Sequence, residues 1–353
     1  MDKKIRIKDI ARMAGVSAGT VDRVLHNRGN VSDDARKAVE KIIKQVDYKP
    51  NMHVSSLSLK RKYKIAVTTP QYSSGAYWES IHKGIKYALD EYENIKVEYR
   101  VLTYNQYDVY SCREVFEKIS HLEMDALIIG PTFKDETIEL CSIMDKREIP
   151  YIFVDSSVDE CHPLAFFSAD HYIVGRLIAN LITSIIPKGS NIGLLQAVRT
   201  GDSSAYTTIL RKKGFTDYLT EMKSTNQVLQ IPFSVSQTED NEKHLSHFFK
   251  NHQKVSGIVV MNSRGSIVSD YLYNNNIDKI KMICMDLTTP NIAAVKKGQI
   301  DLLIGQGPEY QGFYAMKRLL EYLIFKNPVN LQNFVQLDII TKETIDYYKS
   351  FWN

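Results

Sequence analysis

The sequence has few cysteines and no long apolar run. Its four cysteines, Cys112, Cys141, Cys161 and Cys284, lie far apart and form no C-x-x-C pair, which argues against a disulfide framework or a zinc ribbon. The best candidate for a membrane span, residues 177–187, is shorter than the roughly 18 residues that a span needs. The charged first ten residues contain no apolar signal-peptide stretch. We therefore expect a cytoplasmic protein with no membrane partner.

Motifs of the common enzyme classes are also absent. The sequence contains no G-x-x-x-x-G-K-[ST], no H-E-x-x-H and no G-x-S-x-G, which excludes the usual P-loop, zinc-protease and serine-hydrolase signatures. The two glycines that flank Gln306 are too few to cradle a dinucleotide. The histidines at 244, 247 and 252 lie near Glu242 with no cysteine close by, which is typical of a solvated helix face. We therefore expect no enzymatic activity, no cofactor and no metal site.

The 353 residues carry charge unevenly. Hydrophobic residues make up 44% and charged residues 24% of the chain, which is ordinary for a globular protein, and the length suggests two or three domains. Residues 1–64 hold 16 Lys and Arg against 7 Asp and Glu, a net charge of +9, whereas residues 65–353 have a net charge of −5. A basic head on a mildly acidic body indicates a nucleic-acid-binding module joined to another domain.

The head has the pattern of three short helices within residues 7–46. Apolar residues at helical spacing end at Gly15, which can take the positive φ of a tight turn. Ser17 then stands as the N-cap of a second helix, and Ser32 begins a third. Helix, glycine-containing turn and helix form the helix-turn-helix plan, whose second helix enters the DNA major groove.

The run IKDIARMAGVSAGTVDRVLHNRGNVSDDARKAV, followed by DYKPN, resembles the headpiece of the LacI/GalR family of bacterial transcription regulators. The resemblance implies an all-α headpiece at residues 1–49 that binds a near-palindromic operator in double-stranded DNA as a homodimer. Ala18 and Gly19 would select an operator base and Arg23 would reach a base edge, although Ala18 and Gly19 could instead only cap and pack. The implied DNA contacts are Ser17, Ala18, Gly19, Thr20, Asp22, Arg23 and Asn27.

The resemblance also implies a hinge linker at residues 50–62. In the family this stretch becomes helical only on DNA and wedges a leucine into the minor groove. Leu57 matches that leucine in its spacing from Pro50 and Asn51. The alternative is a Ser-rich tether without a defined structure.

From residue 63 onward, short β-rich runs alternate with amphipathic helical runs, which is typical of a doubly wound α/β fold with parallel sheets. There are too many units for one sheet, so we expect two similar lobes with a ligand cleft at the carboxyl ends of the strands. Helices are expected at 78–91, 205–222 and 310–326. The expected strands are 64–69, 96–103, 125–130, 151–155, 191–197, 227–232, 256–261, 281–286 and 302–306.

The body resembles the effector domain of the same family, which shares its fold with periplasmic sugar-binding proteins. The matching stretches are YIFVDS, SADHYIVGRLIANLI, RKKGF and MICMDLTTPNIAAVKKGQIDLLIGQGPEYQGFYAMKRLL. The resemblance implies an effector-binding domain at 63–353, with a first lobe at about 63–168 and 306–328. The second lobe would comprise about 169–305 and 329–353.

Carried over residue by residue, the resemblance implies a site that binds a small carbohydrate or nucleoside. Carboxylates and amides can pair with vicinal hydroxyls, an arginine donates a planar fork, and an aromatic ring covers an apolar sugar face. The alternative is that strand-end Asp and Asn residues merely cap the next helix. Phe133 stands where the family usually has a polar residue. The implied effector contacts are Tyr72, Trp78, Asp155, Arg211, Asn262, Asp286 and Gln306.

Together these patterns predict a ligand-responsive, sequence-specific DNA-binding transcription regulator, with repression as the expected mode. The operator affinity would be controlled by a small sugar-like effector bound between two lobes. The alternative is a solute- or sugar-binding protein without a DNA role, which the body alone would support.

Overall fold

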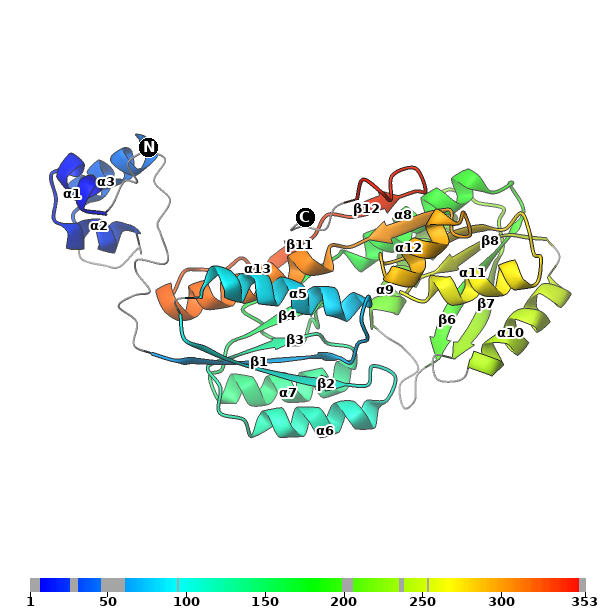
Figure 1. Ribbon diagram of the computed structural model, residues 1–353, viewed down its shortest axis with the longest axis horizontal. Helices are drawn as coiled ribbons and strands as arrows, with labels where there is room; N and C mark the ends of the chain where they lie inside the picture. The colour runs from blue at the N-terminus through cyan, green and yellow to red at the C-terminus, as the bar shows by residue number, and fades with distance from the viewer. Residues whose placement is uncertain are drawn as a thin grey trace. The chain divides into compact units, whose positions relative to one another are not determined.

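A computed structural model describes residues 7–25, 31–45, 61–93, 95–198, 206–234, 238–252 and 254–348 (Figure 1). The chain divides into two compact units, each described by itself below. The first comprises Met1–Lys62, Tyr92–Lys96 and Leu320–Pro328, and the second comprises Tyr63–Glu91, Val97–Leu319 and Val329–Asn353.

The head contains three helices, α1 (Ile7–Ala14), α2 (Ala18–Leu25) and α3 (Asp33–Gln45). Gly15 has a φ of +66°, and the backbone N–H of Thr20 donates to Ser17 Oγ at 3.0 Å. The predicted turn and N-cap are therefore confirmed. The buried side chains that join the helices are Ile10, Ala11, Val21, Val24 and Val39.

The first lobe is built on a six-stranded sheet in the order β11-β5-β4-β3-β1-β2, and all its neighbouring strands are parallel. Helices α5 (Tyr77–Glu91) and α13 (Pro308–Phe325) lie on one face, and α6 (Val109–Ser120) and α7 (Lys134–Lys146) lie on the other (Figure 1). The strands are β1 (Tyr63–Pro70), β2 (Val97–Tyr104), β3 (Ala126–Ile129), β4 (Tyr151–Asp155), β5 (Ala165–Ser168) and β11 (Gln332–Phe334).

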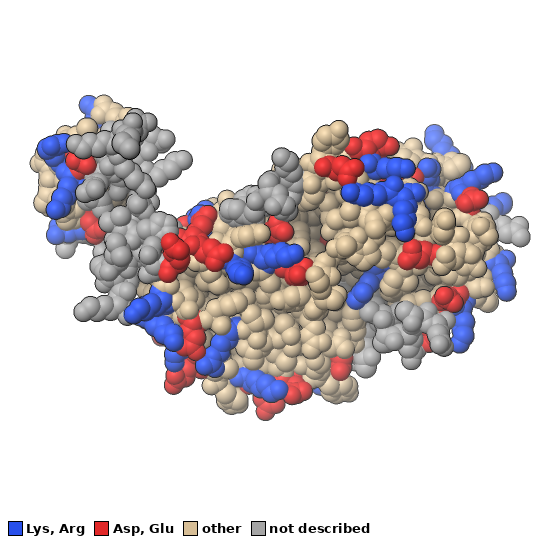
Figure 2. All heavy atoms as spheres, viewed as in Figure 1, with Lys and Arg blue, Asp and Glu red and all other residues tan. Residues whose placement is uncertain are grey.

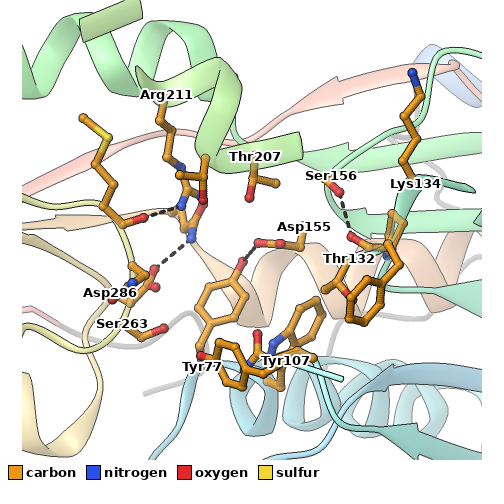
Figure 3. A pocket seen from close by; sticks show the side chains of 18 of the residues that line it. Tyr77, Tyr107, Thr132, Lys134, Asp155, Ser156, Thr207, Arg211, Ser263 and Asp286 are labelled. Atoms are coloured by element: carbon orange, nitrogen blue, oxygen red, sulfur yellow. Dashed lines mark hydrogen bonds between the residues drawn. The ribbon is translucent and has the colours of Figure 1, made fainter. Parts of the chain in front are cut away.

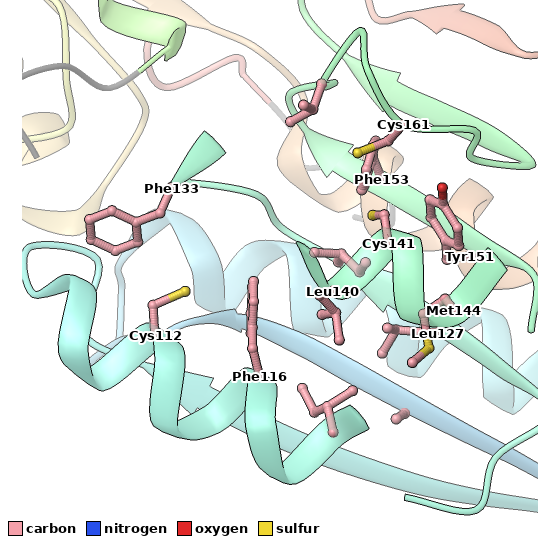
Figure 4. Packing of buried hydrophobic residues seen from close by; sticks show 14 of the residues in the cluster. Cys112, Phe116, Leu127, Phe133, Leu140, Cys141, Met144, Tyr151, Phe153 and Cys161 are labelled. Atoms are coloured by element: carbon pink, nitrogen blue, oxygen red, sulfur yellow. The ribbon is translucent and has the colours of Figure 1, made fainter. Parts of the chain in front are cut away.

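Close packing between the first sheet and helices α6 and α7 explains the buried aromatic and sulfur-containing side chains of this lobe. Phe116 of α6 and Cys141 and Met144 of α7 pack with Phe153 of β4 (Figure 4). All four cysteines of the chain are free and buried, as expected from their spacing. This apolar layer holds the end of β4, which carries Asp155, in a fixed position.

The second lobe has a six-stranded sheet in the order β12-β10-β9-β8-β6-β7, parallel except for β12. Helices α8 (His171–Ile185) and α9 (Tyr206–Glu221) pack on one face. The other face is covered by α10 (Thr238–Asn251), α11 (Gly265–Asn274) and α12 (Thr289–Lys296). The strands are β6 (Asn191–Val198), β7 (Val228–Ser234), β8 (Val255–Val260), β9 (Lys281–Met285), β10 (Leu302–Gly305) and β12 (Asp338–Ile340).

The expected fold class, a helix-turn-helix head joined to a two-lobed α/β domain, is confirmed, and each expected strand is present within a few residues. The boundary drawn at residue 329 needs a correction. Strand β11 pairs with β5 in the first sheet, with Asn333 opposite Phe167, so residues 332–334 belong to the first lobe. The chain therefore passes between the lobes three times, after β5, after β10 and after β11.

Candidate functional site

A cleft at the carboxyl ends of the strands is lined by side chains from both lobes (Figure 3). It offers about 80 Å³ to the centres of water molecules. The cleft therefore suits a small polar molecule rather than a peptide.

Two aspartates occupy matching places in the two lobes. Asp155 ends β4 and Asp286 directly follows β9, and both have left-handed backbone, with φ of 72° and 70°. Asp tolerates this conformation better than most side chains do, and neighbouring groups hold it. The N–H of Asp155 donates to Gln311 Oε1 at 2.8 Å, and the N–H of Asp286 donates to the carbonyl of Ile304 at 2.9 Å.

A linked set of polar side chains forms the wall from the second lobe. Arg211 is buried, and its Nη1 donates to the carbonyl of Met261 at 2.8 Å. Its Nη2 donates to Gln306 Oε1 at 3.3 Å, while Gln306 Nε2 donates to Asp286 Oδ1 at 2.8 Å. Arg211 Nε has no hydrogen-bond partner among the described residues. The guanidinium is therefore held in place by its two terminal nitrogens.

Burial raises the pKa of Asp286 to about 6, and this effect is opposed by Arg211 and Gln306. At neutral pH the side chain is mostly a carboxylate, so it can accept hydrogen bonds from ligand hydroxyls. Burial, with Asp155 and Asp286 nearby, raises the pKa of Tyr77 well above its usual value. Tyr77 therefore stays protonated and donates from Oη to Asp155 Oδ1 at 2.7 Å.

The position of Arg211 depends on a close crossing of α8 and α9. A Cβ at Gly175 would lie 1.9 Å from the backbone oxygen of Arg211 and 2.9 Å from the nitrogen of Phe215. Only glycine lets the two helices approach this closely. Gly175 thus sets how far the guanidinium reaches into the cleft.

Aromatic side chains form much of the wall from the first lobe. Trp78 and Phe133 are almost fully buried, and Tyr107 lines the cleft beside them. A Cβ at Gly130 would lie 2.6 Å from Trp78, so that glycine leaves space for the indole. An aromatic wall facing a polar wall fits a ligand with one apolar face and several hydroxyl groups.

Six of the seven predicted effector residues line this cleft: Trp78, Asp155, Arg211, Asn262, Asp286 and Gln306. Tyr72 does not line it. The residue is 40% exposed, and its ring centroid lies 4.7 Å from that of His82. Its position in the loop after the first strand was the basis of the prediction, and the loop directs it onto α5 instead. Asn262 also accepts from the N–H of Arg264 at 3.0 Å, which is a contact within the loop before α11.

The sequence analysis missed several residues that line the cleft. The most informative is Tyr77, whose signal was its place beside Trp78 at the start of a helix that follows a strand. The others come from loops and helix starts that carry no distinctive pattern. They include Tyr107, Lys134, Ser156, Thr207 and Ser263.

In the head, α2 turns two of the predicted DNA contacts toward solvent. Gly19 and Arg23 are exposed, whereas Ala18, Thr20 and Asp22 are half-buried. Ser17, also exposed, has its Oγ 2.9 Å from Thr20 Oγ1. Asn27, Leu57 and hinge residues 50–60 lie outside the described residues.

The described part of the body carries charges of both signs on its surface (Figure 2). On the face drawn in Figure 2, its basic and acidic side chains alternate and do not gather in a patch of one sign. No helix of the described ranges is long and apolar enough to cross a membrane. Within those same ranges, no three His, Cys, Asp or Glu side chains are grouped to hold a metal ion.

Two family models match the chain. One described as bacterial regulatory proteins, lacI family, matches residues 6–51, and one described as periplasmic binding protein domain matches residues 65–327. The transcriptional regulator MalR of Streptococcus pneumoniae is 23% identical over 312 residues, which cover 82% of this chain and 86% of MalR. The sucrose operon repressor of Staphylococcus xylosus is 29% identical over 178 residues. These cover 50% of this chain, which thus spans about half (52%) of that repressor's length.

Solved structures also resemble the chain over most of its length, and we describe one of them. It is a crystal structure described as a candidate LacI transcriptional regulator from Bacteroides fragilis. The two superpose with a TM-score of 0.78 at 28% identity, covering 82% of this chain and 100% of that one.

Proposed function

Because the chain belongs to the lacI family of bacterial regulatory proteins, we propose that it is a transcription regulator whose operator affinity is set by a small ligand. The observation that carries this proposal is the pairing of a helix-turn-helix head with a two-lobed ligand cleft in one chain. The head has a net charge of +9 over residues 1–64, as phosphate binding requires. Repression is the mode we propose, since relatives include a sucrose operon repressor.

The DNA partner we propose is a near-palindromic operator that a homodimer reads with two copies of α2. Exposed Arg23 is the side chain that can reach a base edge, with Gly19 beside it on the same helix. The predicted contacts from Ser17, Ala18, Thr20, Asp22, Asn27 and Leu57 remain part of the proposal. Such a protein would work in the cytoplasm, where the DNA is.

The ligand we propose is a carbohydrate or nucleoside with vicinal hydroxyls. The chain of contacts from Arg211 through Gln306 to Asp286 presents both donors and acceptors, which vicinal hydroxyls need. Trp78 and Phe133 would cover the apolar face of a pyranose or a base. No described contact in the cleft requires a cofactor.

Two measurements on the purified full chain test the proposal. Selection of bound sequences from random or genomic DNA should return a symmetric motif. A thermal-shift screen of sugars and nucleosides should return a ligand that alters the affinity of the protein for that DNA motif. Saturable ligand binding with no sequence-specific DNA binding would favour a solute-binding protein and overturn the proposal.

A further inference from the structure

A second, larger cavity adjoins the cleft and takes no part in the function proposed above. It offers about 890 Å³ to water centres, against about 80 Å³ in the cleft. Tyr77, Asp286 and Gln306 line both. The rest of its lining comes from the start of α13, the start of α12, and the segment that runs from β11 past β12.

The charge of this cavity has one sign. The charged side chains among the described residues that line it are Asp286, Glu309 and Asp338, all acidic, and no Lys, Arg or His lines it within the described ranges. Burial raises the pKa of Tyr348 to about 12, helped by the charges of Asp338 and Glu309. The carboxylates of Asp338 and Glu309 therefore both raise the pKa of the Tyr348 phenol, so the electrostatic potential inside the cavity is negative.

Aromatic rings form the walls. Tyr310 lines the cavity and is braced by Tyr314, whose ring centroid lies 4.3 Å away. Phe334 is braced edge-on by Phe166 at 5.6 Å. Phe334 and Tyr347 are nonetheless 55% and 81% exposed, so large aromatic surfaces remain open to a ligand. Aromatic faces beside carboxylates are the usual surroundings of a bound organic cation.

Asp338 is set into this cavity by the sheet. It lies opposite Gly305, and a Cβ at Gly305 would approach Asp338 Cβ to 3.3 Å and Leu287 Cδ1 to 2.8 Å. The glycine therefore leaves room for the aspartate. Burial raises the pKa of Asp338, and its carboxylate makes no hydrogen bond or ion pair with the described residues. A partly buried carboxylate without a counter-ion gains most from a cationic ligand.

We propose that this cavity is a second binding site, which takes an organic cation. The ammonium group would lie among Tyr310, Tyr348 and Phe334 and face the carboxylate of Asp338. The site differs in chemistry from the cleft, whose polar wall includes Arg211, and it requires neither DNA binding nor a sugar ligand.

Choline and its uncharged isostere 3,3-dimethylbutan-1-ol test the proposal, because they share a shape and differ in charge. Calorimetry or ligand-observed NMR on the full chain should detect choline binding, with the alcohol about tenfold weaker or more. Asp338→Asn, which keeps the shape of the side chain, should weaken choline binding about tenfold. Tyr310→Leu should weaken it several-fold. Asp278→Asn, which removes an exposed carboxylate elsewhere in the same lobe, should leave it unchanged.

Equal binding of choline and the alcohol would overturn the proposal. So would an Asp338→Asn variant that keeps the parent's circular dichroism spectrum and binds choline as tightly as the parent. Absence of binding by both choline and phenethylammonium into the millimolar range would also overturn it. None of these outcomes depends on whether the cleft binds a sugar or the head binds DNA.

Discussion

Asp286 is the titratable side chain on which ligand binding in the cleft should depend. Its pKa of about 6 means that acid converts it from a carboxylate to a carboxylic acid within an accessible pH range. A protonated Asp286 has lost much of its capacity to accept from ligand hydroxyls. We expect ligand affinity to fall about tenfold between pH 7.5 and pH 5, since only about a tenth of the side chain is ionised at pH 5.

The measurement is calorimetry at several pH values with the sugar or nucleoside that the thermal-shift screen returns. Asp286→Asn should bind that ligand weakly and with no such pH dependence. Equal pH dependence in parent and variant would contradict this assignment.

His82 should make the fold acid-sensitive. It is buried, with Nε2 2.7 Å from Thr69 Oγ1 and Nδ1 3.2 Å from Tyr99 Oη, and burial lowers its pKa to about 4. The folded chain disfavours the charged imidazole. The contribution of neutral His82 to the free energy of unfolding is therefore complete above pH 6.5 and is lost as pH falls toward 4. The full loss corresponds to about 3 kcal/mol.

Denaturant unfolding of the parent and of His82→Gln over this pH range isolates the effect. Protonation of Asp286 works in the opposite direction, because its pKa is raised, but it is common to both proteins. The free energy of unfolding of the parent minus that of His82→Gln should fall by about 3 kcal/mol as pH falls from 7 to 4. A constant difference would show that His82 is not the responsible group.

Arg23 should carry base recognition by the head. Since it is exposed on α2, we expect Arg23→Ala to lose about 1–3 kcal/mol at one base pair of each half-site. Arg12→Ala is the matched control, because it removes the same charge from α1, where Arg12 pairs with Asp9 at 3.5 Å. Anisotropy titrations on the selected operator and on single-base variants measure both. If Arg23→Ala and Arg12→Ala lose equal binding free energy on every DNA sequence tested, Arg23 contacts only phosphates and reads no base.

At this scale the sequence predicted the polar wall better than the aromatic one. Asp286 and Gln306 could be predicted because parallel strands bring their carboxyl ends together, whereas Arg211, on α9, was implied by the family resemblance of the stretch RKKGF. Tyr72 was misplaced, and Tyr77 was overlooked, because the direction of a side chain in a loop or first helical turn depends on its packing. The volume of the second cavity depends on segments that meet only in the folded chain.

At the scale of elements, the crossing of α8 and α9 should link stability to ligand binding. In Gly175→Ala the new methyl group would overlap the backbone of Arg211, so the helices must move apart. We expect a loss of about 1–3 kcal/mol in stability and weaker ligand binding, because Arg211 moves with α9. Ser184→Ala, at an exposed position on the same helix, should change neither the stability nor the ligand affinity. A stable Gly175→Ala variant with unchanged affinity would contradict this account.

Long, periodic elements were predictable and short ones were not. Strands such as β1 and β9 are buried along most of their length, because helices cover both faces of a parallel sheet. Strands β11 and β12 have three residues each, of which all but Ile340 are exposed or only partly buried, so no hydrophobic pattern marks them. Strand β5 has four residues and was not among the expected strands. Strand β11 also accounts for the misplaced lobe boundary.

At the scale of the whole molecule, the ligand can alter operator affinity only through its different affinity for two arrangements of the protein. The hinge at residues 50–62 stays a prediction as the element that responds. Replacing Val54 and Ser56 with glycine should raise the cost of ordering it by roughly 1 kcal/mol per site. We expect this double variant to bind ligand normally, bind operator weakly and respond less to ligand. Parental operator affinity and ligand response would exclude the hinge as the route.

The three passages of the chain between the lobes also affect how the protein is made. Strand β11, which completes the edge of the first sheet beside β5, follows it by roughly 160 residues. At about 5–20 residues per second, a ribosome needs roughly 8–30 s to add them. During that interval the nascent first lobe lacks both β11 and α13, and the edge of β5 is open to pairing with other chains. Chaperones that cover exposed strand edges during translation should therefore raise the yield of this protein more than that of one whose lobes are each contiguous in sequence.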